Sequence, residues 1–106
     1  MSNALGPLHT VNKSPFASRA LDGCLSRLSA GAAVLLIEDG VYAALADTAF
    51  ADRLAETGRN HALYVLGPDL AARGLADRSL VAGIEVIDYQ GFVSLAARHS
   101  LVQAWF

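Results

Sequence analysis

Cys24 is the residue of this sequence best suited to chemistry, and it is the only cysteine, in the stretch Leu21-Asp22-Gly23-Cys24-Leu25. A thiolate is a nucleophile, whereas a buried thiol packs like a small apolar side chain, and access to the sulfur separates the two roles. Helical spacing predicts that Cys24 lies near the edge of an apolar stripe, a position that permits access to the sulfur. Arg27, three residues later, is placed to stabilise a thiolate. From these residues alone we favour a structural cysteine.

Other motifs that carry chemistry are missing. The sequence has no G-x-x-x-x-G-K-[ST] loop, and no G-x-G-x-x-G follows the first predicted strand, so a phosphate-binding loop is not expected. There is no second cysteine for C-x-x-C redox chemistry and no G-x-S-x-G elbow. The adjacent carboxylates Glu38 and Asp39 point apart as they leave a strand, and we interpret Asp39 as a helix cap. The histidines are His9, His61 and His99, without metal-ligand spacing, so we expect no metal and no cofactor.

The composition indicates one folded domain with apolar surface to spare. The chain has 106 residues, of which 54% are hydrophobic and 17% are charged. In average globular proteins about 45–50% of residues are hydrophobic and about 25% are charged. This balance predicts a sheet that is covered on both faces, with some apolar surface left for a partner. The net charge of −2 and the scattered basic residues argue against direct nucleic-acid binding, which needs a basic face.

We expect a cytoplasmic protein without membrane contact. A single cysteine excludes an internal disulfide, and the first residues lack the basic and apolar regions of a signal peptide. The apolar run Ala32–Ile37 is far shorter than the ~18 residues that a membrane span needs.

Five short segments are predicted to form β-strands, because each is rich in apolar or β-branched residues and is bounded by turn-forming residues. One of them, Ala32–Ile37, has no polar alternation, which is typical of a strand buried on both faces. The predicted strands are Leu8–Val11, Ala32–Ile37, His61–Leu66, Ile84–Ile87 and Val102–Phe106.

Helices are predicted between these strands. Apolar residues at intervals of three and four predict a helix around Cys24 that ends at Gly31, with Ser14 or Ser18 as its cap. Asp88 is the predicted cap of the last helix, which carries Phe92–Ala96. The other predicted helical segments are Val41–Ala46, Phe50–Thr57 and Leu70–Arg73, the last of them ended by a left-handed Gly74.

This alternation predicts an α/β fold of three layers (α/β/α), with a central, mostly parallel sheet of four to five strands. We expect a single domain over residues 8–106 and a poorly ordered end over residues 1–7. Ligands and partners of such folds meet the loops at the carboxyl ends of the strands. These loops are Asn12–Phe16, Glu38–Val41, Gly67–Asp69 and Asp88–Gln90.

The same strands and loops carry a family resemblance. Leu8–Phe16, which reads LHTVNKSPF, resembles the L-H-T-x-x-[KR]-S-P opening of the DsrH/TusB family of sulfur-relay proteins. Further similar segments follow in the family's order, so that the likeness covers nearly all of the chain. These segments are Leu36–Ala44, Tyr64–Leu70, Ala72–Gly74, Val86–Tyr89 and Gln103–Trp105.

The resemblance implies a part in persulfide sulfur transfer. It implies a subunit of a cytoplasmic heterohexamer with two copies each of DsrE/TusD-like, DsrF/TusC-like and DsrH/TusB-like chains. In this family the main acceptor cysteine belongs to the DsrE or TusD chain, and sulfur passes on to a DsrC/TusE-like carrier. The Dsr branch serves oxidation of stored sulfur, and the Tus branch serves 2-thiolation of the wobble uridine in tRNA.

Cys24 bears on the choice of branch, because the DsrH branch is expected to have a cysteine on the first helix and the TusB branch commonly lacks it. This resemblance favours a subunit for sulfur oxidation, with a TusB-like subunit for tRNA thiolation as the alternative. It makes Cys24 a candidate persulfide carrier and Arg27 a candidate stabiliser of its thiolate. A purely structural subunit, without sulfur chemistry of its own, is the other alternative, so whether the chain itself is catalytic stays open.

Aromatic residues near strand ends have two interpretations, because they either complete the domain's own core or anchor a partner. For Trp105 and Phe106 we favour a subunit interface. For Tyr42 and Tyr89 both interpretations stay open.

Overall fold

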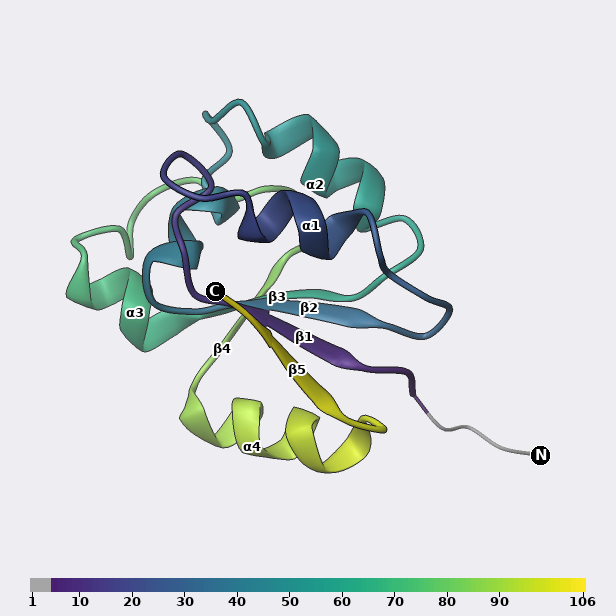
Figure 1. Cartoon of the computed structure of the whole chain (residues 1–106). Helices are drawn as coiled ribbons and strands as arrows, with labels where there is room; N and C mark the ends of the chain where they lie inside the picture. Colours follow the sequence, from purple (N-terminus) through teal and green to yellow (C-terminus); the bar gives the residue numbers. More distant parts are fainter. Residues whose placement is uncertain (1–4) are drawn as a thin grey trace.

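The computed structural model describes residues 5–106 and contains a sheet of five parallel strands with helices on both faces (Figure 1). The strand order is β4-β3-β2-β1-β5. The predicted three-layer α/β fold is confirmed, and all five predicted strands are present. Their bounds are β1 Leu8–Val11, β2 Ala33–Leu36, β3 Leu63–Leu66, β4 Glu85–Ile87 and β5 Val102–Trp105.

The helices lie on the two faces of the sheet in the order that the crossovers require. The chain moves from β1 to β4 in one direction and then returns past β1 to β5, so right-handed crossovers place the last helix on the opposite face. Figure 1 shows α1 and α2 above the sheet and α4 below it. The helices are α1 Ala20–Leu25, α2 Ala51–Thr57, α3 Gly67–Ala72 and α4 Tyr89–Arg98, with a 3-10 helix, η1, at Glu38–Ala44.

Each strand contributes alternate side chains to the two faces, which we call the α1 face and the α4 face. On β2, Val34 and Leu36 join the larger core cluster on the α1 face, whereas Ala33 and Leu35 join the cluster on the α4 face. All four side chains of β2 are buried, as predicted for a strand covered on both sides.

α1 is much shorter than the predicted helix and ends at Leu25 instead of continuing to Gly31. Gly23 lies inside it, at a cost of about 1 kcal/mol relative to alanine. The Ser26 hydroxyl then donates to two carbonyls of the preceding turn, at 3.0 Å each, which competes with continuation of the helix. At the other end, the Ser18 hydroxyl accepts a hydrogen bond from the first amide of α1 at 3.1 Å.

One predicted loop and one predicted helix cap are wrong here. Gly67–Asp69 is not a loop but the first turn of α3, because Pro68 has a preset φ and needs no amide donor at that position. Asp39 does not cap a helix. It lies inside the first turn of η1, which has no side-chain cap, and its carboxylate pairs with Arg73 instead.

Two predicted helix ends are confirmed. The Asp88 carboxylate caps α4 by accepting a hydrogen bond from the Gly91 amide at 2.8 Å, so most of the predicted loop Asp88–Gln90 is helical. Gly74 follows α3 with a φ of 70°, the left-handed conformation that glycine adopts at low cost.

The segment before β1 is joined to the domain. The Gly6 amide donates to the Gly31 carbonyl at 3.0 Å, and Leu5 forms a β-bridge with His99. The expectation of a poorly ordered end falls partly on residues 1–4, which lie outside the described residues. None of the helices within residues 5–106 has the length and apolar character to cross a membrane.

Candidate functional site

Cys24 lies in the apolar core of the α1 face. Its side chain is 0% exposed and belongs to the same buried cluster as Leu21, Val11 and Leu54. The access that an edge position permits is therefore not realised in the folded chain. Because α1 packs against both β1 and β5, the flank that the helical wheel leaves open is covered, and the Trp105 ring lies against Gly23.

Burial makes the Cys24 thiol a poor nucleophile in this conformation. Removal from water raises its pKa from 9.0 to about 12, and no charged neighbour acts in the other direction. At neutral pH such a thiol is almost entirely protonated. Since the thiolate is the reactive species, Cys24 has low reactivity in the folded chain.

Arg27 contacts Cys24 by a hydrogen bond between backbone groups, and not through its side chain. The Arg27 amide donates to the Cys24 carbonyl at 3.0 Å, just after α1 has ended. The Arg27 side chain is exposed, and within residues 5–106 it makes no hydrogen bond or ion pair. Among the described residues, no hydrogen bond or ion pair places its guanidinium where it would stabilise a thiolate at Cys24.

A polar cluster lies instead at the carboxyl ends of β2 and β3. The Asp69 carboxylate accepts a hydrogen bond from the Glu38 amide at 2.6 Å, and Arg73 Nε donates to the Asp39 carboxylate at 2.9 Å. Arg73 also donates to the Asp69 carbonyl at 3.2 Å, which joins the two pairs. We call Glu38, Asp39, Asp69 and Arg73 the carboxyl-end cluster.

The backbone of this cluster is under strain at one residue. Glu38 has a φ of 47°, and within residues 5–106 it is the one non-glycine residue with a positive φ. That conformation costs roughly 1–2 kcal/mol for an L-residue. Two residues later, Gly40 has no room for a Cβ, which would overlap the Val11 carbonyl oxygen. The end of β1 and the start of η1 are therefore in direct backbone contact.

Charge pairing in the cluster favours the protonated, positively charged form of Arg73. Its hydrogen bond to Asp39 raises the pKa of the guanidinium, and the nearby Asp69 carboxylate acts in the same direction. At the neighbouring end of β1, the Asn12 side-chain oxygen is buried without a hydrogen-bond partner among the described residues. This edge of the sheet therefore concentrates fixed charges and polar groups.

Part of the cluster was within reach of sequence reasoning. Glu38 and Asp69 follow neighbouring parallel strands, whose carboxyl ends meet at one edge, and both loops were expected there. Arg73 was not singled out, because its approach to Asp39 depends on α3 starting directly at Gly67.

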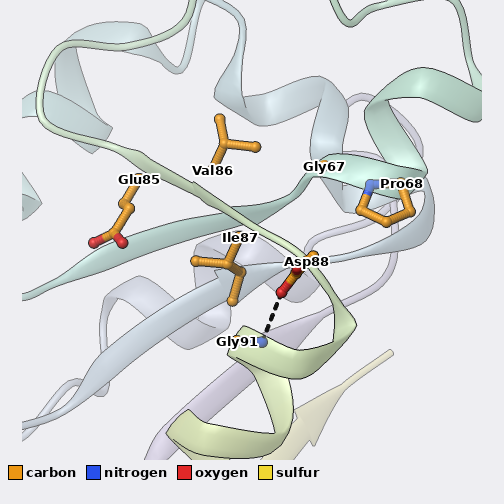
Figure 2. Close-up of a pocket in the computed structure, with 7 residues that line it drawn as sticks. All are labelled: Gly67, Pro68, Glu85, Val86, Ile87, Asp88 and Gly91. Carbon is orange, nitrogen blue, oxygen red and sulfur yellow. Dashed lines mark hydrogen bonds between the residues drawn. The ribbon is translucent and has the colours of Figure 1, made fainter.

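An open cavity of about 490 Å³ lies beside β4 at the edge of the sheet. Figure 2 shows the side chains of Glu85 and Val86 leaving β4 on opposite sides and the Asp88 carboxylate turned towards the Gly91 amide. Asp88 is thus engaged in capping, and none of the described residues that line the cavity is a cysteine, serine, histidine or lysine. Its lining residues are Gly67, Pro68, Glu85, Val86, Ile87, Asp88 and Gly91.

The buried His9 and the partly buried Trp105 form a hydrogen-bonded pair on the α1 face. Trp105 Nε1 donates to His9 Nδ1 at 2.9 Å, so His9 is neutral with its proton on Nε2, which has no partner among the described residues. Burial, assisted by repulsion from His61, lowers the pKa of His9. Trp105 therefore packs against the domain's own core, and its role at a subunit interface stays a prediction.

The other aromatic residues divide between core and surface. Tyr42 packs against the core of the α1 face, whereas Tyr89 is mostly exposed. Phe106 is 82% exposed and is the apolar side chain left open at the end of β5.

The remaining histidines contact backbone carbonyls. His61 Nδ1 lies 2.8 Å from the Ala32 oxygen, and His99 Nδ1 lies 2.8 Å from the Gly6 oxygen. Across the part of the chain that the structure describes, no group of three or more His, Cys, Asp or Glu side chains is arranged to hold a metal ion.

Two solved structures share the fold. The ychN protein from Escherichia coli superposes with a TM-score of 0.81, at 18% identity, over 95% of this chain and 99% of that chain. MTH1491 from Methanobacterium thermoautotrophicum, a protein of unknown function, has a TM-score of 0.65 at 12% identity, over 96% and 99% of the two chains. At such low identity the likeness concerns the fold alone.

Curated relatives show the family. Protein TusB of Pectobacterium parmentieri is 39% identical over 98 residues, and that of Erwinia tasmaniensis is 42% identical over the same length. Protein TusB of Escherichia coli O1:K1 is 40% identical over 100 residues. Each match covers 92% of this chain and 99% of the relative. The family model described as "DsrH like protein" matches residues 13–102, and the chain belongs to this family, DsrH/TusB.

Proposed function

We propose that this chain is a TusB-type subunit of a sulfur-relay complex that serves 2-thiolation of the wobble uridine in tRNA. The observation that carries the proposal is the match to proteins named TusB over almost their whole length. By the same likeness, its partners are TusC-like and TusD-like subunits in a cytoplasmic heterohexamer, and a TusE-like chain accepts the sulfur. The DsrH-like role in oxidation of stored sulfur, which Cys24 favoured in the sequence, has less support.

We further propose that the chain acts as a structural subunit and that another subunit carries the sulfur. A persulfide carrier must use its thiolate to attack the sulfane sulfur of a donor, with the donor thiolate leaving, and must then release that sulfur to an acceptor thiolate. Cys24 is buried, its thiol pKa is raised to about 12, and Arg27 does not contact its side chain. A carrier role for Cys24 is the competing proposal, and it requires α1 to leave the sheet.

The branch of the family is tested in cells. Deletion of the gene is expected to lower the 2-thiouridine content of tRNA, measured by liquid chromatography with mass spectrometry, and the wild-type gene is expected to restore it. An unchanged 2-thiouridine content, together with loss of growth on stored sulfur, would favour the sulfur-oxidation role instead.

The structural role is tested in the reconstituted complex. Cys24→Ala is expected to assemble with the sister chains and to transfer sulfur to the acceptor at the wild-type rate. Mass spectrometry of the wild-type complex, loaded by a cysteine desulfurase, is expected to find no added sulfur atom on Cys24. A variant complex that assembles fully but transfers sulfur much more slowly, with persulfide mapped to Cys24 in the wild type, would establish the carrier role.

A further inference from the structure

The two edges of the sheet are protected to different degrees. Exposed edge strands pair with other strands unless they are short, charged, bulged or covered. β4 spans three residues, one of them Glu85, and Asp88 follows it. β5 spans four residues, and the sequence from Ser100 to Phe106 contains no charged side chain. Within residues 5–106, no strand pairs with the outer edge of β5 (Figure 1).

The backbone groups of β5 that face outward are identified by its pairing with β1. The carbonyls of Leu101 and Trp105 accept hydrogen bonds from the β1 side, at 2.8 and 3.4 Å. Because backbone groups alternate along a strand, the amides and carbonyls of Val102 and Ala104 point away from β1. They are available for another strand.

Apolar side chains flank this open edge. Leu101 is 50% exposed, Val102 44% and Phe106 82%, so three of the exposed large hydrophobic residues of the chain lie within six positions. By the register with β1, Val102 and Ala104 lie on the α4 face, and Phe106 continues this alternation.

We propose that the edge of β5 binds the β5 edge of a second copy of this chain, antiparallel and across a two-fold axis. A two-fold axis at Ala104 places Ala104 opposite its own copy and Val102 opposite Phe106 of the other chain, a favourable pair of a β-branched and an aromatic side chain. When a charged strand pairs with its own copy, like charges come close together and repel. β5 has no charged side chain, so this repulsion does not arise. The two sheets then join into one. This surface lies beyond the proposed function and does not depend on it.

The register is tested by cross-linking. In the Ala104→Cys variant the two introduced thiols face each other at the Cα separation of about 5.5 Å that a disulfide needs. Mild oxidation is expected to convert most of this variant into a covalent dimer, because the native Cys24 is buried and does not compete. Val86→Cys is the matched control, since Val86 is similarly exposed on the opposite edge strand, and it is expected to give only a trace of dimer.

The association itself is tested by light scattering during gel filtration over a range of concentrations. Wild-type chain is expected to approach twice the 11.1 kDa chain mass as its concentration rises. Val102→Lys is expected to stay monomeric and Val86→Lys to behave as wild type, with circular dichroism showing that both variants are folded. A wild-type monomer at every concentration, or equal cross-linking of the two cysteine variants, would overturn the proposal.

Discussion

Cys24 and the carboxyl-end cluster belong to the same domain but have opposite physical environments. The thiol of Cys24 is surrounded by apolar side chains and has no charged group that favours its ionised form. The carboxyl-end cluster, by contrast, combines three carboxylates with a guanidinium on two neighbouring chain segments, next to a strained residue. Of the two regions, only the carboxyl-end cluster carries charged side chains.

This contrast shows that the type of a residue does not by itself decide whether it can react or bind. A cysteine reacts according to its thiolate fraction and its access, and the fold removes both from Cys24. Polar residues of ordinary types gain a shared location because parallel strands end at one edge. Substitutions at Gly40, Asp69 and Asp39 and the alkaline titration of Cys24 separate the two environments.

Gly40→Ala is expected to destabilise the domain most. The new Cβ would overlap the Val11 carbonyl oxygen, which is a backbone atom and cannot turn aside, so the end of β1 and η1 must move apart. We expect a loss of about 3 kcal/mol or more in the free energy of unfolding, the upper range for overpacking. Gly74→Ala is the control, since Gly74 has open space and only its φ of 70° resists the change. Urea denaturation measures the free energy of unfolding of both variants. Equal losses in the two variants would contradict the close backbone contact at Gly40.

The buried thiol is expected to make stability fall at alkaline pH. The pKa of Cys24 is higher in the folded chain than in the unfolded chain, so its contribution is complete below pH 9 and is lost as the pH rises from 9.0 towards about 12. The expected slope is about 1.4 kcal/mol per pH unit. Other groups also titrate there, so the stability difference between wild type and Cys24→Ala isolates the thiol. A difference that does not change with pH would mean that Cys24 is accessible.

Asp69→Ala is expected to cost about 1–2 kcal/mol, because the Glu38 amide loses its carboxylate acceptor. Asp69→Asn keeps an oxygen acceptor without the charge and is expected to recover part of this loss. The midpoints of thermal unfolding of wild type, Asp69→Ala and Asp69→Asn, all at one pH, measure these differences. Identical midpoints for the alanine and asparagine variants would show that the hydrogen bond to Glu38 is not what Asp69 contributes.

Asp39→Asn is expected to have the smallest effect, about 0.5 kcal/mol or less. The Asp39 side chain is mostly exposed, so water screens its attraction to Arg73. The loss is expected to shrink further when salt is added, and denaturation at low and high salt checks this. A loss above that of Asp69→Ala would reverse the ranking within the cluster.

Secondary structure was largely predictable where it rested on local chemistry. The short strand segments β1 and β2, the Asp88 cap and the left-handed Gly74 each depend on a few neighbouring residues. The length of α1 was not predicted, because Ser26 redirects its hydroxyl to the preceding carbonyls. The start of α3 was missed because Gly67 and Pro68 are as typical of a loop as of a first helical turn.

The sequence by itself determined the class of fold and the family, since periodic apolar residues, turn residues and ordered motifs are readable along one dimension. Tertiary structure alone decided the state of the thiol and the partner of Arg73. A helical wheel shows which side of α1 is apolar, but not that Trp105, eighty-two positions after Gly23, lies against that helix. Burial and ion pairing depend on packing between distant segments, and the pKa of Cys24 follows from that packing.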